Sequence, residues 1–287
     1  MIDSNKFYSE YYGHPLDDLR KLHDEFRKNG KNIIWLVGDS SLDNKHWIKN
    51  EPRSGACNGY EDILEPADCV PDVAYWMNYE LFHLDKPTNY VCINAAVEES
   101  TIGGRRDLLS HDKFVRDHLG ENDIIISSMG GNDVALKPSF TTIASITNIL
   151  YGFGDIYNVE NTYLDLLIRQ DTQNILEKIC RKVKPKCILP CITYYPSLKG
   201  KSWADGILNT LKYDKNYENV HILIQQLFKT STKNIRVYDI QMVPVALYEV
   251  LNCEDEGDYV ERVEPSAQGS WKMAKEFVSL FTNTKQS

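Results

Sequence analysis

Short apolar runs alternate with longer segments in which apolar residues recur every three or four positions, along the whole chain. Apolar runs of four to eight residues bounded by turn residues are typical of strands buried in a parallel sheet. Segments with the longer period are typical of amphipathic helices. We expect strands at 32–38, 90–94, 124–129, 187–192 and 235–240, and helices at 16–28, 71–84, 105–119, 163–183, 218–228 and 267–281.

Strands that alternate with helices predict βαβ units, and therefore a parallel sheet with helices on both faces. The expected fold class is α/β, a three-layer α/β/α sandwich of flavodoxin-like topology with a five-stranded parallel sheet. No internal repeat interrupts the alternation, so residues 1–287 are expected to form a single domain. Two stretches with little periodicity, about 43–70 and 137–161, are interpreted as long insertions. We expect the first to cross the carboxyl edge of the sheet. Loops of that length inside a compact domain are usually functional.

Composition narrows the class of protein without identifying it. The formal net charge is -9 and no basic run offsets it, which argues against a nucleic-acid partner. No run of 18 apolar residues and no signal peptide is visible, so we expect no membrane insertion and a cytoplasmic location. The seven cysteines include no Cys-x-x-Cys pair, which gives no support for a zinc or redox motif. The oligomeric state is left open.

Three of the expected strands end in small or polar residues. These residues are Gly38-Asp39-Ser40, Asn94-Ala95-Ala96 and Gly130-Gly131-Asn132-Asp133. In a doubly wound sheet such strand ends lie side by side at the edge where ligands bind. A hydroxyl, a carboxamide and free backbone N–H groups are the components of an acyl-transfer site.

These segments resemble the sequence blocks of the SGNH hydrolases, also called the GDSL esterase/lipase family. The three strand ends correspond to the first three blocks, and Glu261-Arg262-Val263-Glu264-Pro265-Ser266 corresponds to the last one. The four blocks occur in family order. The resemblance implies that Ser40 is the nucleophile and that an oxyanion hole forms from the Ser40 N–H, the N–H of residue 96 and a side chain of the third block. The binding residues that it implies are Ala96, Asn132, Asn94, Asp39 and Gly131.

The last block departs from the family pattern at its catalytic position. Glu264 stands where the family has histidine, and Glu261 stands where it has the aspartate that orients the histidine. An ordinary glutamate, with a pKa near 4.3, is a poor base and, once ionised, no acid. Burial, or the like charge of Glu261, would raise the pKa of Glu264 toward the useful range. His46, His111 and Lys45 remain alternative bases.

The leading hypothesis is therefore a serine esterase that hydrolyses a small acyl ester and needs no cofactor or metal. The alternative is a catalytically weak or inactive SGNH-like protein that binds a ligand or a protein partner. A third possibility is that Asp39, Glu261 and Glu264 gather around Mg²⁺ or Ca²⁺. Nucleotide binding lacks the required motif, because no lysine follows a glycine loop. Aromatic residues in the loops, Trp203 among them, either form an acceptor surface or pack onto the sheet.

Overall fold

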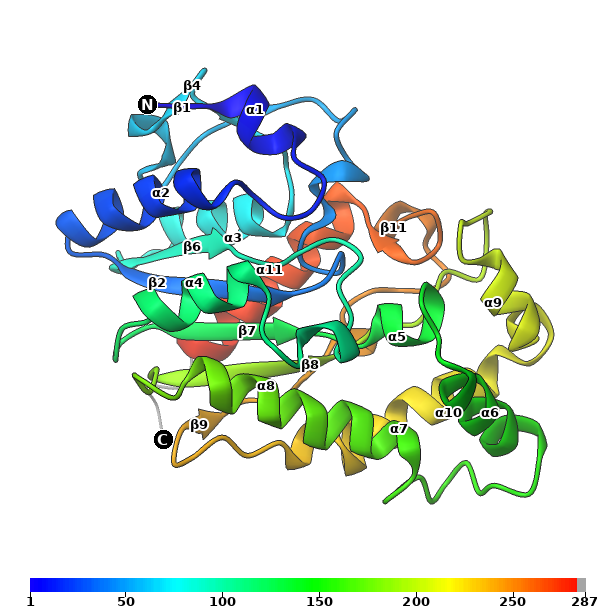
Figure 1. Cartoon of the computed structure of the whole chain (residues 1–287). Coiled ribbons are helices and arrows are strands. Elements are labelled where there is room, and N and C mark those ends of the chain that lie inside the picture. The colour runs from blue at the N-terminus through cyan, green and yellow to red at the C-terminus, as the bar shows by residue number, and fades with distance from the viewer. Residues whose placement is uncertain (283–287) are drawn as a thin grey trace.

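A parallel sheet forms the centre of the computed structural model, which describes residues 1–282 (Figure 1). Its strands are β2 (Asn32–Gly38), β6 (Tyr90–Asn94), β7 (Ile124–Ser128), β8 (Cys187–Ile192), β9 (Gln241–Met242) and β10 (Val245–Ala246). They lie in the order β10-β8-β7-β2-β6, and β9 also pairs with β8. All these pairings are parallel. The sheet therefore has the five strand positions that we expected. The short strands β9 and β10 together occupy the edge position beside β8.

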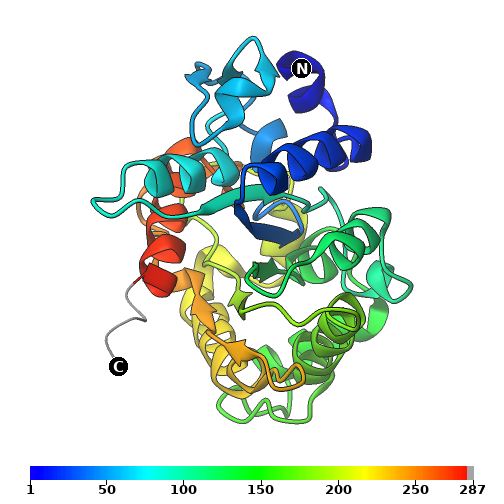
Figure 2. The same cartoon turned by 90° about the vertical axis from the view of Figure 1, so that its left-hand side faces the viewer.

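Alternate residues of the strands point to opposite faces of the sheet, and helices cover both faces (Figure 2). On one face, Ile33 and Trp35 of β2 pack with α2 (Leu16–Lys28), α4 (Ser110–His118) and α8 (Thr172–Ile179). On the other face, Ile34 and Leu36 pack with α3 (Val73–Phe82) and α11 (Ala267–Thr282). The three-layer α/β/α sandwich predicted from the sequence is confirmed.

The insertion at 43–70 lies mainly beside the edge strand β6, and not over the carboxyl edge of the sheet as we expected (Figure 1). Its buried residues, including Tyr60 and Leu64, join the core on the α2 face. It also packs with the N-terminal segment, because β1 pairs with β4. Its short elements are β3 (Ser54–Gly55), β4 (Leu64–Glu65) and β5 (Asp68–Cys69), and the N-terminal segment contributes β1 (Ile2–Asp3) and α1 (Ser4–Ser9).

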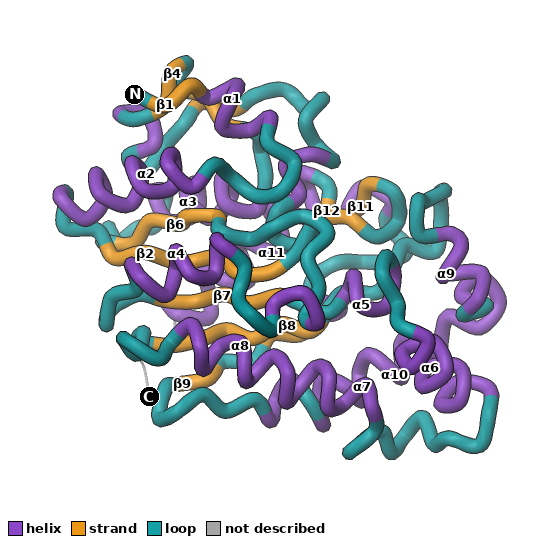
Figure 3. The backbone as a smooth tube through the Cα atoms, in the orientation of Figure 1, coloured by secondary structure: helices purple, strands orange, loops and turns teal. Residues whose placement is uncertain are grey.

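A group of helices gathers beyond the carboxyl ends of the strands (Figure 3). It consists of α5 (Gly131–Ala135), α6 (Phe140–Tyr151), α7 (Tyr163–Leu166), α9 (Asp205–Thr210) and α10 (Tyr213–Thr230). Residues 140–151 were expected to be irregular and are a helix, and α9 was not predicted. These helices share a separate apolar core with Ile192 at the end of β8. We call this group the helical cap.

Several boundaries differ from the predicted ones for local reasons. The helix expected from residue 105 begins at Ser110, because Leu108 adopts a left-handed conformation (φ 53°). The helix expected from Pro71 begins after Asp72, whose side chain accepts a hydrogen bond from the Tyr75 N–H. The long helix at 163–183 ends at Ile179 and contains a π turn at Leu167–Asp171.

The strand predicted at 235–240 does not form. Tyr238 has a left-handed φ of 48°, which interrupts an extended chain. The sheet is instead completed by β9 and β10, and Pro244 lies between them. Proline has no N–H to donate, which suits a break between two short strands.

No helix within the described residues is long and apolar enough to cross a membrane.

Candidate active site

Ser40 lies in a tight turn directly after β2. The turn is closed by the N–H groups of Leu42 and Asp43, which both donate to the Asp39 carbonyl at 3.0 Å. Ser40 is therefore in a single turn and not at the start of a helix. Glycine is needed before this turn, since a Cβ on Gly38 would lie 1.9 Å from the Ser128 carbonyl oxygen.

Buried polar groups hold this turn in place. Asp39 Oδ1 accepts hydrogen bonds from the Ser41 N–H at 3.1 Å and from the Ser41 hydroxyl at 2.7 Å. The guanidinium of Arg105, fully buried, donates to the Gly38 carbonyl and pairs with Asp112. Burial raises the pKa of Asp39, and the hydrogen bonds from Ser41 oppose that shift.

Asn132 is presented by α5, which starts after Gly130 at the end of β7. Gly130 has a φ of 107°, a conformation that favours glycine. The Asn132 side-chain amide donates to the Ser100 carbonyl at 3.1 Å, and the second N–H of the same amide has no acceptor within residues 1–282. Asp133 fixes the facing loop by accepting hydrogen bonds from the Ile102 N–H (2.8 Å) and the Gly103 N–H (3.3 Å).

A hairpin positions Glu264. Its strands are β11 (Tyr259–Val260) and β12 (Glu264–Pro265), and Glu264 pairs with Val260. Two residues of its turn, Glu261 and Arg262, adopt left-handed conformations (φ 53° and 64°). The buried Arg262 side chain ties the hairpin to the helical cap through Asp205 (3.1 Å) and Asp214 (2.6 Å). The position of Glu264 is thus set by contacts on both sides.

Glu264 is almost fully buried, with 1% of the residue's surface exposed. Oε1 accepts a hydrogen bond from the Trp203 indole N–H at 3.2 Å, whereas Oε2 has no partner of standard geometry among the described residues. Burial raises the pKa of Glu264 well above its ordinary value, and the charge of Asp39 adds to that rise. The adjacent Ser40 hydroxyl and the Trp203 N–H lower the pKa, but their effect is smaller.

A second buried carboxyl group, Glu98, was missed by the sequence analysis. Its Oε1 accepts from the Trp47 indole N–H at 3.2 Å, and its Oε2 has no partner among the described residues. Burial raises the pKa of Glu98, and the charge of the nearby Glu264 is the next largest cause. The charge of one of these neighbouring carboxyl groups disfavours ionisation of the other. Glu98 precedes Glu99 in the loop after β6, and no sequence motif distinguishes it.

A cavity of about 160 Å³ brings most of the sequence-predicted residues together. Asp39, Ser40, Gly131, Asn132 and Glu264 all line it. Glu261 does not line this cavity: its exposed carboxylate accepts a hydrogen bond from the Trp203 backbone N–H at 2.9 Å. Glu261 therefore contacts the residue that holds Glu264, and not Glu264 itself.

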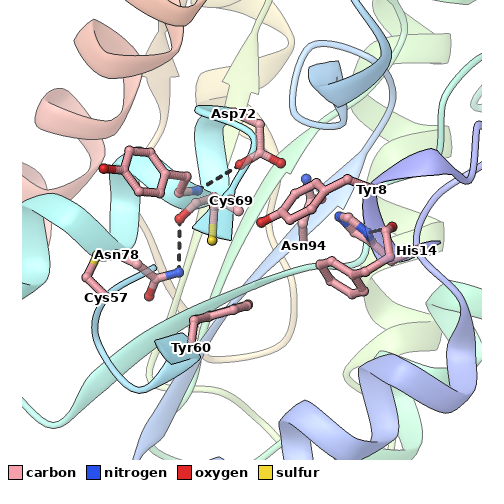
Figure 4. Close-up of a pocket in the computed structure, with 11 residues that line it drawn as sticks. Tyr8, His14, Cys57, Tyr60, Cys69, Asp72, Asn78 and Asn94 are labelled. Atoms are coloured by element: carbon pink, nitrogen blue, oxygen red, sulfur yellow. Dashed lines mark hydrogen bonds between the residues drawn. The ribbon is translucent and has the colours of Figure 1, made fainter. Parts of the chain in front are cut away.

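Asn94 and Ala96 lie outside this cavity, which corrects their expected place. The Ala96 N–H, expected in the oxyanion hole, donates to the Asn94 side chain at 3.0 Å. The Asn94 amide in turn donates to the Leu42 carbonyl at 2.9 Å. Figure 4 shows Asn94 at a different cavity, together with Asp72 and Tyr8. That cavity is much smaller, with a volume of about 10 Å³. Asn94 thus braces the turn that carries Ser40.

The alternative bases also lie elsewhere. No histidine or lysine lines the cavity within the described residues. His46 packs edge-on against Tyr11, with ring centroids 4.6 Å apart. The His111 ring is hydrogen-bonded through Nε2 to the backbone carbonyl of His14 at 2.8 Å. Lys45 is fully buried and forms an ion pair with Asp43 at 2.6 Å.

The carboxylates proposed for a divalent cation do not meet as a metal site. Within residues 1–282 no group of three His, Cys, Asp or Glu side chains is arranged to hold a metal ion. Asp39 and Glu264 reach the cavity, but the Glu261 side chain is exposed and does not line it.

Neither a scan against protein-family models nor a search of curated proteins gives a match. Among solved structures, the chain is similar to a lipase/acylhydrolase from Enterococcus faecalis, with 12% identity, 89% of this chain and 100% of that chain covered, and a TM-score of 0.46. It is also similar to a family 3 carbohydrate esterase from Clostridium thermocellum (13% identity, 88% and 96% covered, TM-score 0.45). A carbohydrate acetylesterase from Sinorhizobium meliloti gives 12% identity, 88% and 100% coverage and a TM-score of 0.45. These similarities concern the path of the backbone.

Proposed function

We propose that this chain, which has an SGNH hydrolase-like fold, hydrolyses small carboxylic esters through Ser40, with Glu264 as the general base. The proposal is based on the surroundings of Glu264. A buried carboxyl group lies beside the Ser40 hydroxyl, with one oxygen held by Trp203 and the other without a partner among the described residues. Such an oxygen is placed to accept a proton and to return it.

In the proposed reaction Ser40 Oγ attacks the acyl carbon while its proton moves to the Glu264 carboxylate. The carbonyl electrons move to the oxygen, and their return breaks the bond to the alcohol, which leaves with the proton from Glu264. Water then loses a proton to Glu264 and attacks the acyl group on Ser40. Breakage of the Oγ–acyl bond releases the carboxylic acid, and the proton returns to Ser40.

The environment of Glu264 supports its proposed role as a base. Burial raises the pKa of Glu264, and a general base works best when its pKa is near the working pH. The Asn132 amide and the Ser40 N–H are the proposed donors to the oxyanion. We do not assign the Ala96 N–H this role, because Asn94 already accepts its hydrogen bond.

A serine-directed fluorophosphonate and a p-nitrophenyl ester test the proposal together. Wild type should take the label and hydrolyse the ester, and Ser40→Ala should do neither. Ser279→Ala, which removes a hydroxyl on α11, is the matched control and should behave as wild type. Glu264→Gln should lower kcat by about 10²-fold or more while the fold is kept. Equal labelling of Ser40→Ala and wild type would remove Ser40 as the nucleophile.

The same burial favours the alternative, a ligand-binding protein without turnover. A carboxyl group that stays protonated at the working pH accepts no proton, and both Glu264 and Glu98 have raised pKa values. In that case wild type shows no hydrolysis at any pH from 5 to 9. Glu264→His, which restores the family's base, would then gain activity. A wild-type rate that falls in Glu264→Gln contradicts this alternative.

A further inference from the structure

The cavity at Ser40 extends from the strand ends into the helical cap, and its two ends differ in chemistry. The polar end holds Ser40, Asn132 and Glu264. Every residue that α6, α7, the π turn at 167–171 and α10 present to the cavity is Ile, Leu or Val. Examples are Ile146, Leu164 and Leu223, each at least 95% buried. A ligand that fits both ends has one polar group and one aliphatic tail.

The volume sets the length of that tail. In another protein, an engineered cavity of about 150 Å³ with walls of Leu, Ile and Phe binds benzene, a molecule of six carbons. The cavity here is of similar size, about 160 Å³. An acetyl group would leave most of its apolar wall uncovered. An unbranched chain of about six carbons would cover that wall and fill the space.

We infer that the helical cap forms an acyl-binding site for an unbranched aliphatic chain of about six carbons, with the carbonyl group at Ser40. The placement of the carbonyl rests on the proposed function, and the binding of the tail does not. Burial of each added methylene should raise kcat/KM or affinity about fourfold, so hexanoyl compounds should exceed acetyl compounds by about 10²-fold. The gain should stop once the cavity is full.

Neutral primary amides separate binding from turnover. They carry a carbonyl for the polar end, and they bear no charge that the buried carboxylates would repel. Binding of acetamide, hexanamide and decanamide to wild type and to Ser40→Ala is measured by calorimetry. We expect hexanamide to bind both proteins, acetamide to bind at least 50-fold more weakly, and decanamide to gain nothing over hexanamide.

Two tryptophan variants of the same helix provide a matched pair. Leu164 lines the cavity and is 1% exposed, whereas Leu166, two residues away, is 39% exposed and does not line it. Leu164→Trp should fill the cavity and abolish hexanamide binding, and Leu166→Trp should bind it as wild type does. If Leu164→Trp does not fold, Leu164→Ala supplies the test, because a larger cavity should shift the preferred amide to a longer chain.

The outcomes distinguish this inference from the proposed function. If the protein binds hexanamide but hydrolyses no ester, the inferred acyl-binding site is supported and the proposed esterase function is wrong. Ester hydrolysis with equal rates for acetyl and hexanoyl esters, and without hexanamide binding, keeps the esterase and rejects the acyl site. Equal loss of binding in Leu164→Trp and Leu166→Trp also rejects it.

Discussion

At the scale of single residues, Trp203 forms hydrogen bonds with both glutamates of the last sequence block. Its indole N–H holds Glu264 Oε1, and its backbone N–H holds Glu261. A hydrogen bond donated to a carboxylate favours the ionised form. The Trp203 hydrogen bond therefore limits how far burial raises the pKa of Glu264.

Trp203→Phe should shift the pH dependence of ester hydrolysis. The phenyl ring keeps an apolar side chain against the core of the helical cap but donates no hydrogen bond, so the pKa of Glu264 should rise further. The acidic limb of the kcat/KM profile should move to higher pH, and the rate at pH 7 should fall. Trp271→Phe, which removes an exposed indole hydrogen-bonded to Glu80, is the control. A limb that stays in place, or moves to lower pH, contradicts the assignment of Glu264 as the base.

The buried Asp72 should make the free energy of unfolding depend on pH, and this effect should be independent of catalysis. Burial raises the pKa of Asp72 to about 7, and its Oδ2 has no hydrogen-bond partner within the described residues. The unfolded chain has the ordinary aspartate pKa near 3.9. Between pH 4 and 7 the folded state therefore binds a proton that the unfolded state has lost. Stability should fall as pH rises through this interval, by up to about 1.4 kcal/mol per pH unit.

Asp72→Asn isolates this contribution. Asparagine keeps the carbonyl that caps α3 through the Tyr75 N–H, and it removes the buried charge. The free energy of unfolding, measured in urea, should show a variant-minus-wild-type difference that grows from pH 4 to pH 7 and is constant above. A difference that does not change with pH would mean that Asp72 ionises normally in the folded protein.

The residues that sequence could identify are those that belong to ordered blocks. Ser40, Asn132 and Glu264 follow from motifs at strand ends or near the C-terminus, and the structure places all three at one cavity. Glu98 belongs to no such block, because only the fold brings it close to Glu264. The same limit applies to Asn94, whose motif does not reveal which side of the turn its side chain takes.

At the scale of elements, the junction of β2 with its turn depends on close contact between two strands. β2 and β7 pair through Gly38 and Ser128. Gly38→Ala would place a methyl group against the Ser128 carbonyl, and the backbone there cannot move away without losing the pairing. We expect a loss of about 3 kcal/mol or more in the free energy of unfolding.

Gly206→Ala is the matched control for that prediction. Gly206 lies within α9, and a Cβ there meets nothing within 4 Å. Alanine in a helix is favoured over glycine, so this variant should gain about 0.5–1 kcal/mol in urea unfolding. If both variants have the same stability, the close approach of β2 and β7 does not exist.

Elements were predicted well where the apolar period is clear and poorly where propensity conflicts with packing. α6 was missed because it is rich in Thr and Ile, β-branched residues that weaken helix propensity. It forms because Ile146, Ile149 and Leu150 are buried against α7 and α10. At 235–240 the apolar residues are buried as a strand's would be, but the left-handed Tyr238 breaks the extension. Burial alone does not define a strand.

At the scale of the whole molecule, the alternation of strands and helices was sufficient to predict the α/β/α sandwich, but it did not predict the cavity. The walls of the cavity come from segments between residues 39 and 264 that meet only in the folded chain. Their apolar residues are indistinguishable in sequence from ordinary core residues. The acyl group that we propose as the ligand is therefore argued from the arrangement of the helical cap, and not from any motif.

A buried ion pair connects the N-terminal segment, the turn after β2 and the loop after β6. Asp43 and Lys45 are both fully buried and 2.6 Å apart. Asp43 Oδ2 also accepts hydrogen bonds from the Gly13 N–H (3.1 Å) and the Glu98 N–H (3.2 Å). Removal of one partner of a buried pair leaves an uncompensated charge, whereas removal of both charges is often neutral.

Lys45→Met should therefore cost about 3–5 kcal/mol in the free energy of unfolding. The double variant Asp43→Asn/Lys45→Met should recover most of that loss, because the asparagine oxygen still accepts from the backbone N–H groups. Urea unfolding of the two single variants and the double variant gives the coupling energy. Because Asp43 holds the backbone of Glu98, Lys45→Met should also lower the rate of ester hydrolysis at temperatures where it is still folded. Additive single-variant effects would show that the pair does not join these segments.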